Sequence, residues 1–274
     1  MNNNAAMLVI GAGGLVGSHL VRANPERTIP ITRNSTKKLE SHVIRDVSTL
    51  VFLAQSSAYT VPLFVTDLLA VNVELLRRTL HAVAGTVPKV ILFSTGSVYK
   101  ASGSELTEDS PVDVDTTIPY VASKLASEFI AQSFAGFFES ISIVRPFFIY
   151  GSGQRKTMLF SKLQADLLAG ESLAVGQDGG IVFNPVHVSD VVRFIELLHE
   201  SPLPGLNKVN LYGPESTTLE GVINHMADIL NVPANLVRDE RPLNMMVAKS
   251  KHVFFQSYCG IRKGILEMLS KHGA

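Results

Sequence analysis

The sequence has little of what would point to several classes of protein. A single cysteine, Cys259, excludes an internal disulfide and a multi-thiolate metal site, and favours a reducing compartment. The 24 basic and 24 acidic residues cancel, so no electrostatic footprint points to nucleic acid or an anionic membrane as the main partner. No apolar run approaches the ~20 residues that span a bilayer, and the Asn-rich start lacks a cationic export signal. We therefore expect a soluble, cytoplasmic protein.

What the sequence does have is apolar material for a large core, since 46% of its 274 residues are hydrophobic. Short apolar runs alternate with helical patterns through the first two thirds of the chain. The predicted strands are Met7–Ile10, Thr28–Thr32, Leu50–Ala54, Val90–Ser94 and Ile141–Val144, and the predicted helices are Leu15–Ala23, Leu68–Ala84 and Val121–Phe134. Strands that are apolar throughout are buried on both faces, so the fold class is α/β, with a doubly wound parallel sheet.

Two regions depart from a regular alternation. The stretch Arg33–Ser48 is shorter than the ~30 residues of a full strand–helix–strand unit, so we expect a trimmed sheet with at most a strand stub at His42–Arg45. After Tyr150 the pattern loosens, which indicates a small C-terminal lobe. There we predict helices at Met158–Ala169, Asp190–Leu198, Leu219–Leu230 and Ile261–Lys271, a strand at Lys208–Leu211 and a turn at Gln177–Gly180.

The segment GAGGLVG at residues 11–17 connects the first predicted strand to the first predicted helix. Glycines at Gly11, Gly14 and Gly17 permit a tight turn and let the backbone approach a pyrophosphate, which then binds the amides at the helix N-terminus. The alternative is a plain glycine-rich turn. No Gly-Lys-Ser/Thr follows, which excludes a nucleoside triphosphatase loop.

The end of the second strand decides between the two nicotinamide dinucleotides. A carboxylate there accepts the 2′-hydroxyl of NAD, whereas an arginine accommodates the 2′-phosphate of NADP. This chain has Arg33 and no acid before Glu40, which favours NADP over NAD, unless Arg33 is only a solvated loop residue. Asp46 either contacts the adenine or caps the short segment before Leu50.

Candidate chemistry begins at Tyr120, which is the one tyrosine of six with a lysine, Lys124, four residues later. On a helix the two side chains share one face, and a nearby ammonium stabilises a phenolate, so the tyrosine can exchange a proton at neutral pH. A surface Tyr/Lys neighbour is the alternative for the pair taken alone. Thr95 and Ser97 follow the buried strand Val90–Ser94, where open α/β sheets bind ligands, although turn chemistry also explains both hydroxyls.

Together these motifs resemble the extended short-chain dehydrogenase/reductase family, in its NAD(P)-dependent epimerase/dehydratase branch that modifies nucleotide sugars. The resemblance covers nearly the whole chain after Met7. It rests on the glycine loop, on Leu53-Ala54-Gln55, Asn72 and Phe93–Tyr99, on Pro119–Lys124 with Glu128, on Arg145–Gln154 and on Val186–Asp190. It implies a Rossmann-like domain over 7–150 plus about 186–213, and a substrate-binding lobe over about 151–185 plus 214–274.

The resemblance also implies roles for single residues. Tyr120 is the general acid/base, Lys124 lowers its pKa and holds the nicotinamide ribose, and Thr95 orients the substrate oxygen. The cofactor-binding residues are then Gly11, Gly14, Leu15, Val16, Gly17, Arg33, Asp46, Ala54, Asn72, Tyr120, Lys124 and Pro146. The substrate-binding residues are Ser97, Phe147, Phe148 and Asn184. His187 is a structural histidine rather than a catalyst, and no metal is expected.

Departures from the family pattern limit these expectations. Gly96 and Ser97 stand where sugar dehydratases carry acidic residues, which disfavours dehydration. The loop preceding His187 usually begins with Arg-Asp, but here Phe183-Asn184-Pro185 stands instead, which puts the pyrophosphate-side contacts of a sugar nucleotide in doubt. We expect a homodimeric reductase of a keto-sugar nucleotide, or a 4-epimerase. The alternatives are a reductase of a small non-nucleotide carbonyl compound and a non-catalytic cofactor sensor.

Overall fold

The computed structural model describes residues 6–33, 44, 46–56, 65–100, 103–252 and 258–270. The chain divides into two compact units. The first unit comprises Met1–Lys100, Pro111–Pro146 and Val192–Val209. The second comprises Ala101–Ser110, Phe147–Val191 and Asn210–Ala274. Each unit is described separately below.

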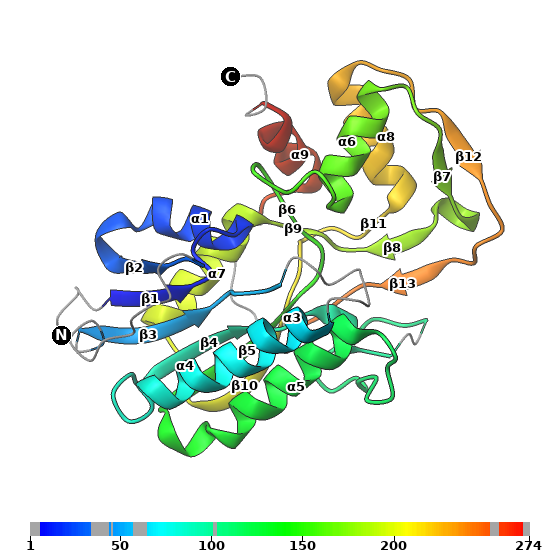
Figure 1. Ribbon diagram of the computed structural model, residues 1–274. Helices are drawn as coiled ribbons and strands as arrows, with labels where there is room; N and C mark the ends of the chain where they lie inside the picture. The colour runs from blue at the N-terminus through cyan, green and yellow to red at the C-terminus, as the bar shows by residue number, and fades with distance from the viewer. Residues whose placement is uncertain are drawn as a thin grey trace. The chain divides into compact units, whose positions relative to one another are not determined.

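A six-stranded sheet organises the first unit, in the order β10-β5-β4-β3-β1-β2 (Figure 1). The strands are β1 (Ala6–Ile10), β2 (Thr28–Ile31), β3 (Val47–Phe52), β4 (Lys89–Phe93), β5 (Ser140–Pro146) and β10 (Gly205–Leu211). Each neighbouring pair from β2 to β5 is parallel. The predicted parallel sheet is confirmed. The chain order reverses between β1 and β3, which is where open sheets of this kind bind ligands at their carboxyl ends.

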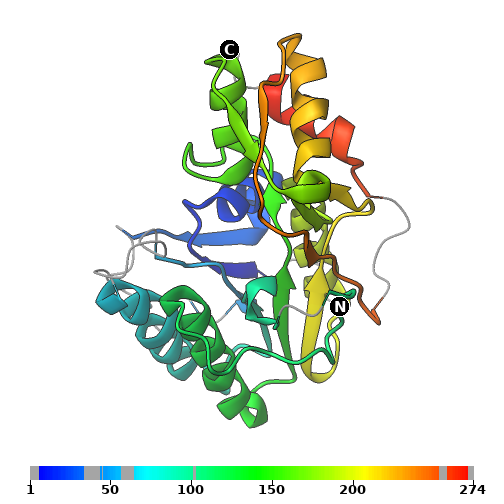
Figure 2. The same ribbon diagram turned by 90° about the vertical axis from the view of Figure 1, so that its right-hand side faces the viewer.

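Helices cover both faces of this sheet. A continuous helical segment contains α3 (Val65–Leu69), the π-helix η3 (Ala70–Leu75) and α4 (Leu76–Val83). It runs beside α5 (Pro119–Ser133) on one face (Figures 1 and 2). The other face carries α1 (Leu15–Ala23) and α7 (Val188–Glu200), which are linked where Asn24 donates a hydrogen bond to Glu196 at 2.7 Å. Short 3₁₀ turns occur at η1 (Pro25–Arg27), η4 (Gly96–Val98) and η5 (Ala135–Phe137).

The core of the first unit has two layers, because successive side chains along each strand point to opposite faces of the sheet. Alternate strand residues form a cluster with α4 and α5; it includes Leu8, Ile10, Leu50, Phe52, Val90, Leu92, Ile141, Ile143, Leu76, Leu80, Val83 and Ala131. The intervening residues, such as Met7, Val9 and Val51, are fully buried on the opposite face. Burial on both faces explains why these strands are apolar throughout. The predicted stub at His42–Arg45 lies outside the described residues, except for Ile44, which is buried in this cluster.

In its described residues, the second unit is built from short strands and three helices. The helices are α6 (Leu159–Leu168), α8 (Leu219–Leu230) and α9 (Ile261–Ser270), and the turn η6 spans Gln177–Gly179. Small sheets join β11 (Thr217–Thr218), β8 (Ile181–Phe183) and β13 (Asn244–Met246), then β12 (Leu236–Arg238) and β7 (Leu173–Val175), and β6 (Ile149–Tyr150) and β9 (Val186–His187). No helix in the described part of the chain is long and apolar enough to cross a membrane.

Candidate dinucleotide site and catalytic helix

The glycine loop fits the close backbone approach that a pyrophosphate requires. Gly11 has φ +95°, and a Cβ there would lie 2.6 Å from the nitrogen of Ala54, which lies two residues beyond the neighbouring strand β3. A Cβ on Gly17 would lie 2.4 Å from the Gly11 carbonyl oxygen. Both positions therefore require glycine, and the spacing that marked them in the sequence reflects real steric constraints.

The start of α1 presents its backbone amides without competition. Gly14 is the N-cap and has no side chain to bond them, and no acidic residue lies in the first turn, which contains Leu15 and Val16. The positive end of the helix dipole is thus left for an anion. The donors and the steric room fit the pyrophosphate of a dinucleotide, with Ala54 beside the loop, two residues beyond β3.

The two residues predicted near the adenosine are placed differently. Arg33 lies exposed two residues beyond β2, on the same edge of the sheet as the glycine loop. Asp46 instead immediately precedes β3, where its carbonyl accepts a hydrogen bond from the Ala6 N–H at 3.1 Å. Since β3 is parallel to β1, Asp46 lies at the amino end of the sheet, roughly 20 Å of strand from the carboxyl edge. The structure therefore disfavours the predicted adenine contact.

Tyr120 lies in the first turn of α5, which begins with Pro119 and has no acidic residue in that turn. Proline suits this position because its missing N–H would have no partner inside the helix. Lys124, one turn later, is buried, and its ammonium donates a hydrogen bond to the Phe93 carbonyl at 2.9 Å. That bond holds the Tyr120/Lys124 helix against the carboxyl end of β4, directly before Ser94 and Thr95.

Burial lowers the pKa of Lys124 to about 8, although the negative charge of Glu128 opposes the shift. A lysine with a lowered pKa loses its proton more readily than a surface lysine but is still mostly charged at pH 7. A charged ammonium stabilises a nearby phenolate, as does the positive end of a helix dipole. The environment of α5 is therefore suited to proton exchange at Tyr120.

Replacement of Lys124 by methionine is expected to change how stability depends on pH. The unfolded lysine titrates near 10.4 and the folded one near 8, so between these values the unfolded chain binds more protons. The wild-type free energy of unfolding should therefore rise with pH across this window, by about 3 kcal/mol relative to the variant. Urea unfolding at several pH values checks this, with exposed Lys100→Met as the control; equal slopes in wild type and Lys124→Met would contradict it.

The hydroxyls after β4 differ in their surroundings. Thr95 is buried and caps the turn η4, where its Oγ1 accepts a hydrogen bond from the Ser97 N–H at 3.2 Å. Ser97 is exposed. The turn chemistry considered as an alternative for Thr95 is therefore present. This bond uses the Thr95 Oγ1 atom only as an acceptor, and a hydroxyl can accept one hydrogen bond and donate another at the same time.

Asn72 lies in the middle of the π-helix η3 and is 1% exposed. Its side chain donates a hydrogen bond to the Ser123 hydroxyl at 2.9 Å, and Ser123 in turn donates to the Tyr120 carbonyl at 2.8 Å. The Oδ1 atom of Asn72 has no hydrogen-bond partner among the described residues. Single π turns occur often at functional sites. Here the π turn brings a polar side chain, through Ser123, to the backbone of α5 beside Tyr120.

A buried ion pair beneath α5 was not among the predicted site residues. Arg145 of β5 donates two hydrogen bonds to Glu128, at 3.0 and 2.6 Å, and both side chains are at most 3% exposed. Ser94 also donates to Glu128, at 2.5 Å, and the guanidinium of Arg145 lies 4.7 Å from the centre of the Tyr99 ring. The signal available in the sequence was Arg145, the one charged residue of the strand β5.

The predicted substrate residues of the second unit have structural contacts. Phe147 is 1% exposed. Phe148 has φ +48°, unusual for a bulky residue, and its ring packs on Phe183 at 4.7 Å. The Asn184 amide is buried and pairs with Ala248 in both directions, at 2.8 and 2.9 Å. Both polar atoms of the Asn184 side chain therefore have partners within the protein, and this structural role accounts for the residue without a substrate contact. Pro146, by contrast, ends β5 at the carboxyl edge of the main sheet.

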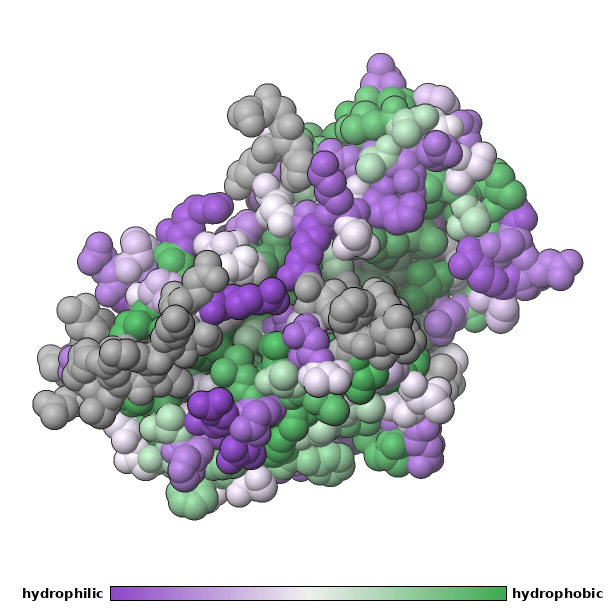
Figure 3. Space-filling view, viewed as in Figure 1, coloured by the Kyte–Doolittle hydropathy of each residue, from purple (hydrophilic) through white to green (hydrophobic). Residues whose placement is uncertain are grey.

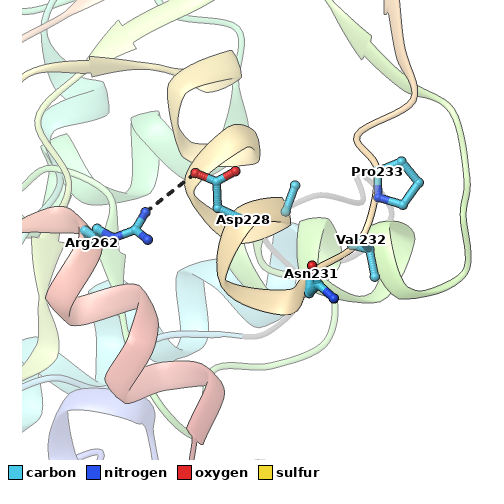
Figure 4. Close-up of a pocket in the computed structure, with 6 residues that line it drawn as sticks. Asp228, Asn231, Val232, Pro233 and Arg262 are labelled. Atoms are coloured by element: carbon cyan, nitrogen blue, oxygen red, sulfur yellow. Dashed lines mark ion pairs between the residues drawn. The ribbon is translucent and has the colours of Figure 1, made fainter.

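A pocket of about 440 Å³ in the second unit is lined by none of the predicted site residues (Figure 4). It is lined by Ala227, Asp228, Asn231, Val232, Pro233 and Arg262. The two charged groups in this lining face each other, with Arg262 3.6 Å from Asp228. The pocket therefore offers no unmatched charge to a ligand.

Comparisons with known proteins agree with this arrangement. The sequence profile of the NAD dependent epimerase/dehydratase family matches residues 7–211. The chain is 28% identical over 167 residues to UDP-glucose epimerase YtcB of Bacillus subtilis (strain 168), itself uncharacterized; this match covers 60% of the chain and 52%, about half, of the relative. It is 25% identical over 280 residues to dTDP-4-dehydro-6-deoxy-D-allose reductase of Streptomyces sp, covering 86% and 85% of the two chains.

Solved structures show the same fold. MoeE5 in complex with UDP-glucuronic acid and NAD superposes with a TM-score of 0.80 at 25% identity, covering 97% of this chain and 99% of MoeE5. The predicted α/β fold with a Rossmann-like sheet is confirmed. Since the family profile spans well over half of the sequence, from β1 to β10, the chain belongs to the NAD dependent epimerase/dehydratase family.

Proposed function

We propose that this protein is a nicotinamide-dependent enzyme that reduces a keto-sugar nucleotide or epimerises a nucleotide sugar at C4, with Tyr120 as general acid and base. The hydrogen bond from Lys124 to the Phe93 carbonyl carries the proposal. It fixes the Tyr120/Lys124 helix at the carboxyl end of β4, on the sheet edge that also carries the glycine loop. Catalytic pair and dinucleotide cradle thus belong to one edge of one sheet.

The residues of this edge divide the proton chemistry among them. When a carbonyl is reduced, the Tyr120 hydroxyl gives its proton to the oxygen that becomes the alcohol, and the Lys124 ammonium stabilises the phenolate left behind. Thr95 donates a hydrogen bond to the same substrate oxygen. In the oxidation direction the Tyr120 phenolate takes the alcohol proton. The nicotinamide, when bound, supplies or accepts the hydride.

The substrate class is inferred from the relatives. Two of them are named for reactions of UDP- and dTDP-sugars, and MoeE5 was solved with UDP-glucuronic acid and with UDP-glucose. Gly96 and Ser97 still disfavour a dehydratase. Asn184-Pro185 keeps a small non-nucleotide carbonyl substrate as the second candidate, because the expected Arg-Asp is missing. A non-catalytic sensor is disfavoured because Tyr120 and Lys124, which a protein without catalytic activity does not need, are both present.

The cofactor proposal now leans toward NAD. The expectation of NADP rested on Arg33, whereas the structural neighbours with a named cofactor carry NAD. Titration of the purified protein should give tighter binding of NADH than of NADPH, with Arg33→Ala changing the NADH affinity less than about twofold. NADPH binding that is tighter, and is lost in Arg33→Ala, would restore the NADP assignment. Mass spectrometry of ligand released from the purified protein identifies a cofactor that co-purifies.

A homodimer is part of the proposal and rests on the face formed by α3–α4 and α5. Leu69 on α3 and Phe129 on α5 are 47% and 61% exposed, and Figure 3 shows apolar and charged side chains interleaved on this face. Light scattering should give twice the chain mass for the wild type and one chain mass for Phe129→Glu. Leu168→Glu, on α6 of the second unit, is the matched control and should stay dimeric. A monomeric wild type at micromolar concentration would contradict the proposal.

The predicted cytoplasmic location still rests on the sequence alone.

A further inference from the structure

A cluster of three side chains of metal-binding types lies in the second unit and includes none of the residues assigned above to cofactor or catalysis. Ligand atoms of His187, Cys259 and Glu267 all lie within 4.8 Å of one another. His187 ends β9, Cys259 lies two residues before α9, and Glu267 lies in α9. His187 and Cys259 are only 4% and 8% exposed. Their wide separation in the sequence explains why no spacing motif revealed them.

The surroundings of the cluster orient its ligands. The Nδ1 atom of His187 lies 2.8 Å from the Ser189 hydroxyl and accepts a hydrogen bond from the Ser189 N–H at 3.4 Å, so Ser189 occupies Nδ1 and Nε2 is the nitrogen left for a ligand. Metal-binding histidines commonly have such a partner on the second nitrogen. The backbone N–H of Cys259 donates to Oδ2 of the fully buried Asp190 at 2.7 Å, which holds the cysteine in place. The ring of Tyr150 packs edge-on against His187, with 5.2 Å between ring centres.

Cys259 and Glu267 both bind a metal in their negatively charged forms. Lys263 approaches Glu267 only to 3.9 Å, and its side chain is 73% exposed. A divalent cation would balance the thiolate of Cys259 and the carboxylate of Glu267. Thiolate, imidazole and carboxylate together are ligands that Zn²⁺ accepts.

We propose that His187, Cys259 and Glu267 bind one Zn²⁺ ion, with water as the fourth ligand, and that this ion fastens α9 to β9. Zinc–ligand bonds of about 2.0–2.3 Å place tetrahedral donors roughly 3.3–3.8 Å apart. Donors within 4.8 Å reach that spacing through side-chain rotation, above all of the long Glu267 side chain. The sequence led us to expect no metal. The ion proposed here has a structural role, not a catalytic one.

Cobalt titration of the untagged protein, first dialysed against EDTA, tests the site. Co²⁺ should bind at one equivalent per chain and produce a thiolate-to-cobalt charge-transfer band in the near ultraviolet. Because Cys259 is the only cysteine of the chain, this band assigns the ligand in the wild type without any variant. Zn²⁺ should then displace the cobalt, abolish the band and raise the melting temperature. Saturable binding without the band, or no binding, would overturn the proposal.

Variants separate the three ligands. Cys259→Ser should lose the band, and Glu267→Gln should weaken Zn²⁺ binding by about 10–100-fold. His225→Gln, on α8 of the same unit but outside the cluster, should bind as the wild type does. Equal Zn²⁺ affinity in Cys259→Ser and the wild type would contradict the assignment. The readouts need neither nicotinamide nor sugar, so they are independent of the proposed enzyme activity.

Discussion

Replacement of Tyr120 by phenylalanine is expected to lower turnover by about 10²–10⁴-fold, the usual contribution of a positioned acid or base. The ring keeps its place in the first turn of α5, so the helix and the Lys124–Phe93 bond are retained. Only the transferable proton is lost. Nicotinamide binding, measured by fluorescence titration, should therefore change less than about threefold.

Tyr212→Phe is the matched control for this prediction. Its hydroxyl accepts a hydrogen bond from the Ser250 N–H at 3.2 Å in the second unit, so the substitution removes a tyrosine hydroxyl outside α5. Turnover should stay within a few fold of the wild type. Full activity of Tyr120→Phe, or an equal loss in Tyr212→Phe, would remove Tyr120 from the mechanism.

Replacement of Glu128 by alanine is expected to cost about 3–5 kcal/mol of stability, because it leaves a buried guanidinium without its counter-ion. Arg145 is 1% exposed and donates two hydrogen bonds to the Glu128 carboxylate. For a chain of this size the melting temperature should fall by roughly 6–20 °C. Removing Glu128 also removes the negative charge that raises the pKa of Lys124, so that pKa should fall further.

Two further variants test whether burial is the cause. The double variant Glu128→Gln, Arg145→Met removes both charges and should recover much of the loss, since buried pairs exchange for apolar groups at little cost. Glu74→Ala breaks the exposed pair with Arg77 and should cost less than about 1 kcal/mol. Denaturant unfolding gives all three values. A loss below 1 kcal/mol for Glu128→Ala would show that the pair contributes little.

Long, periodic elements could be predicted from the sequence. Leu15–Ala23 and Leu219–Leu230 begin and end as expected, because in each case a local signal marks the start: Gly14 before α1 and the Thr218 cap before α8. The glycine loop and the spacing of Tyr120 and Lys124 were also readable, since steric need at Gly11 and the helical period are local properties. In these cases a residue's neighbours in sequence are its neighbours in space.

Features made by tertiary contact could not be predicted. The pairing of Glu128 with Arg145, and the cluster around Cys259, depend on which elements the fold brings together. Strands of two or three residues, such as β7 and β12, contain too few residues to show a period. Asp46 lies directly before β3, at the edge of the sheet opposite the glycine loop, which disfavours the adenine contact that the sequence left open.

The role of Tyr120 in the conversion of a nucleotide sugar is tested most directly by NMR analysis of reaction products. The purified protein is incubated with UDP- and dTDP-sugars and their 4-keto derivatives, in the presence of NADH or NAD. A small-ketone set serves as the competing substrate class. Wild-type protein should convert at least one sugar nucleotide to its C4 epimer or 4-alcohol, and Tyr120→Phe should not. Conversion of the ketones alone, or equal conversion by Tyr120→Phe, would contradict the proposed function.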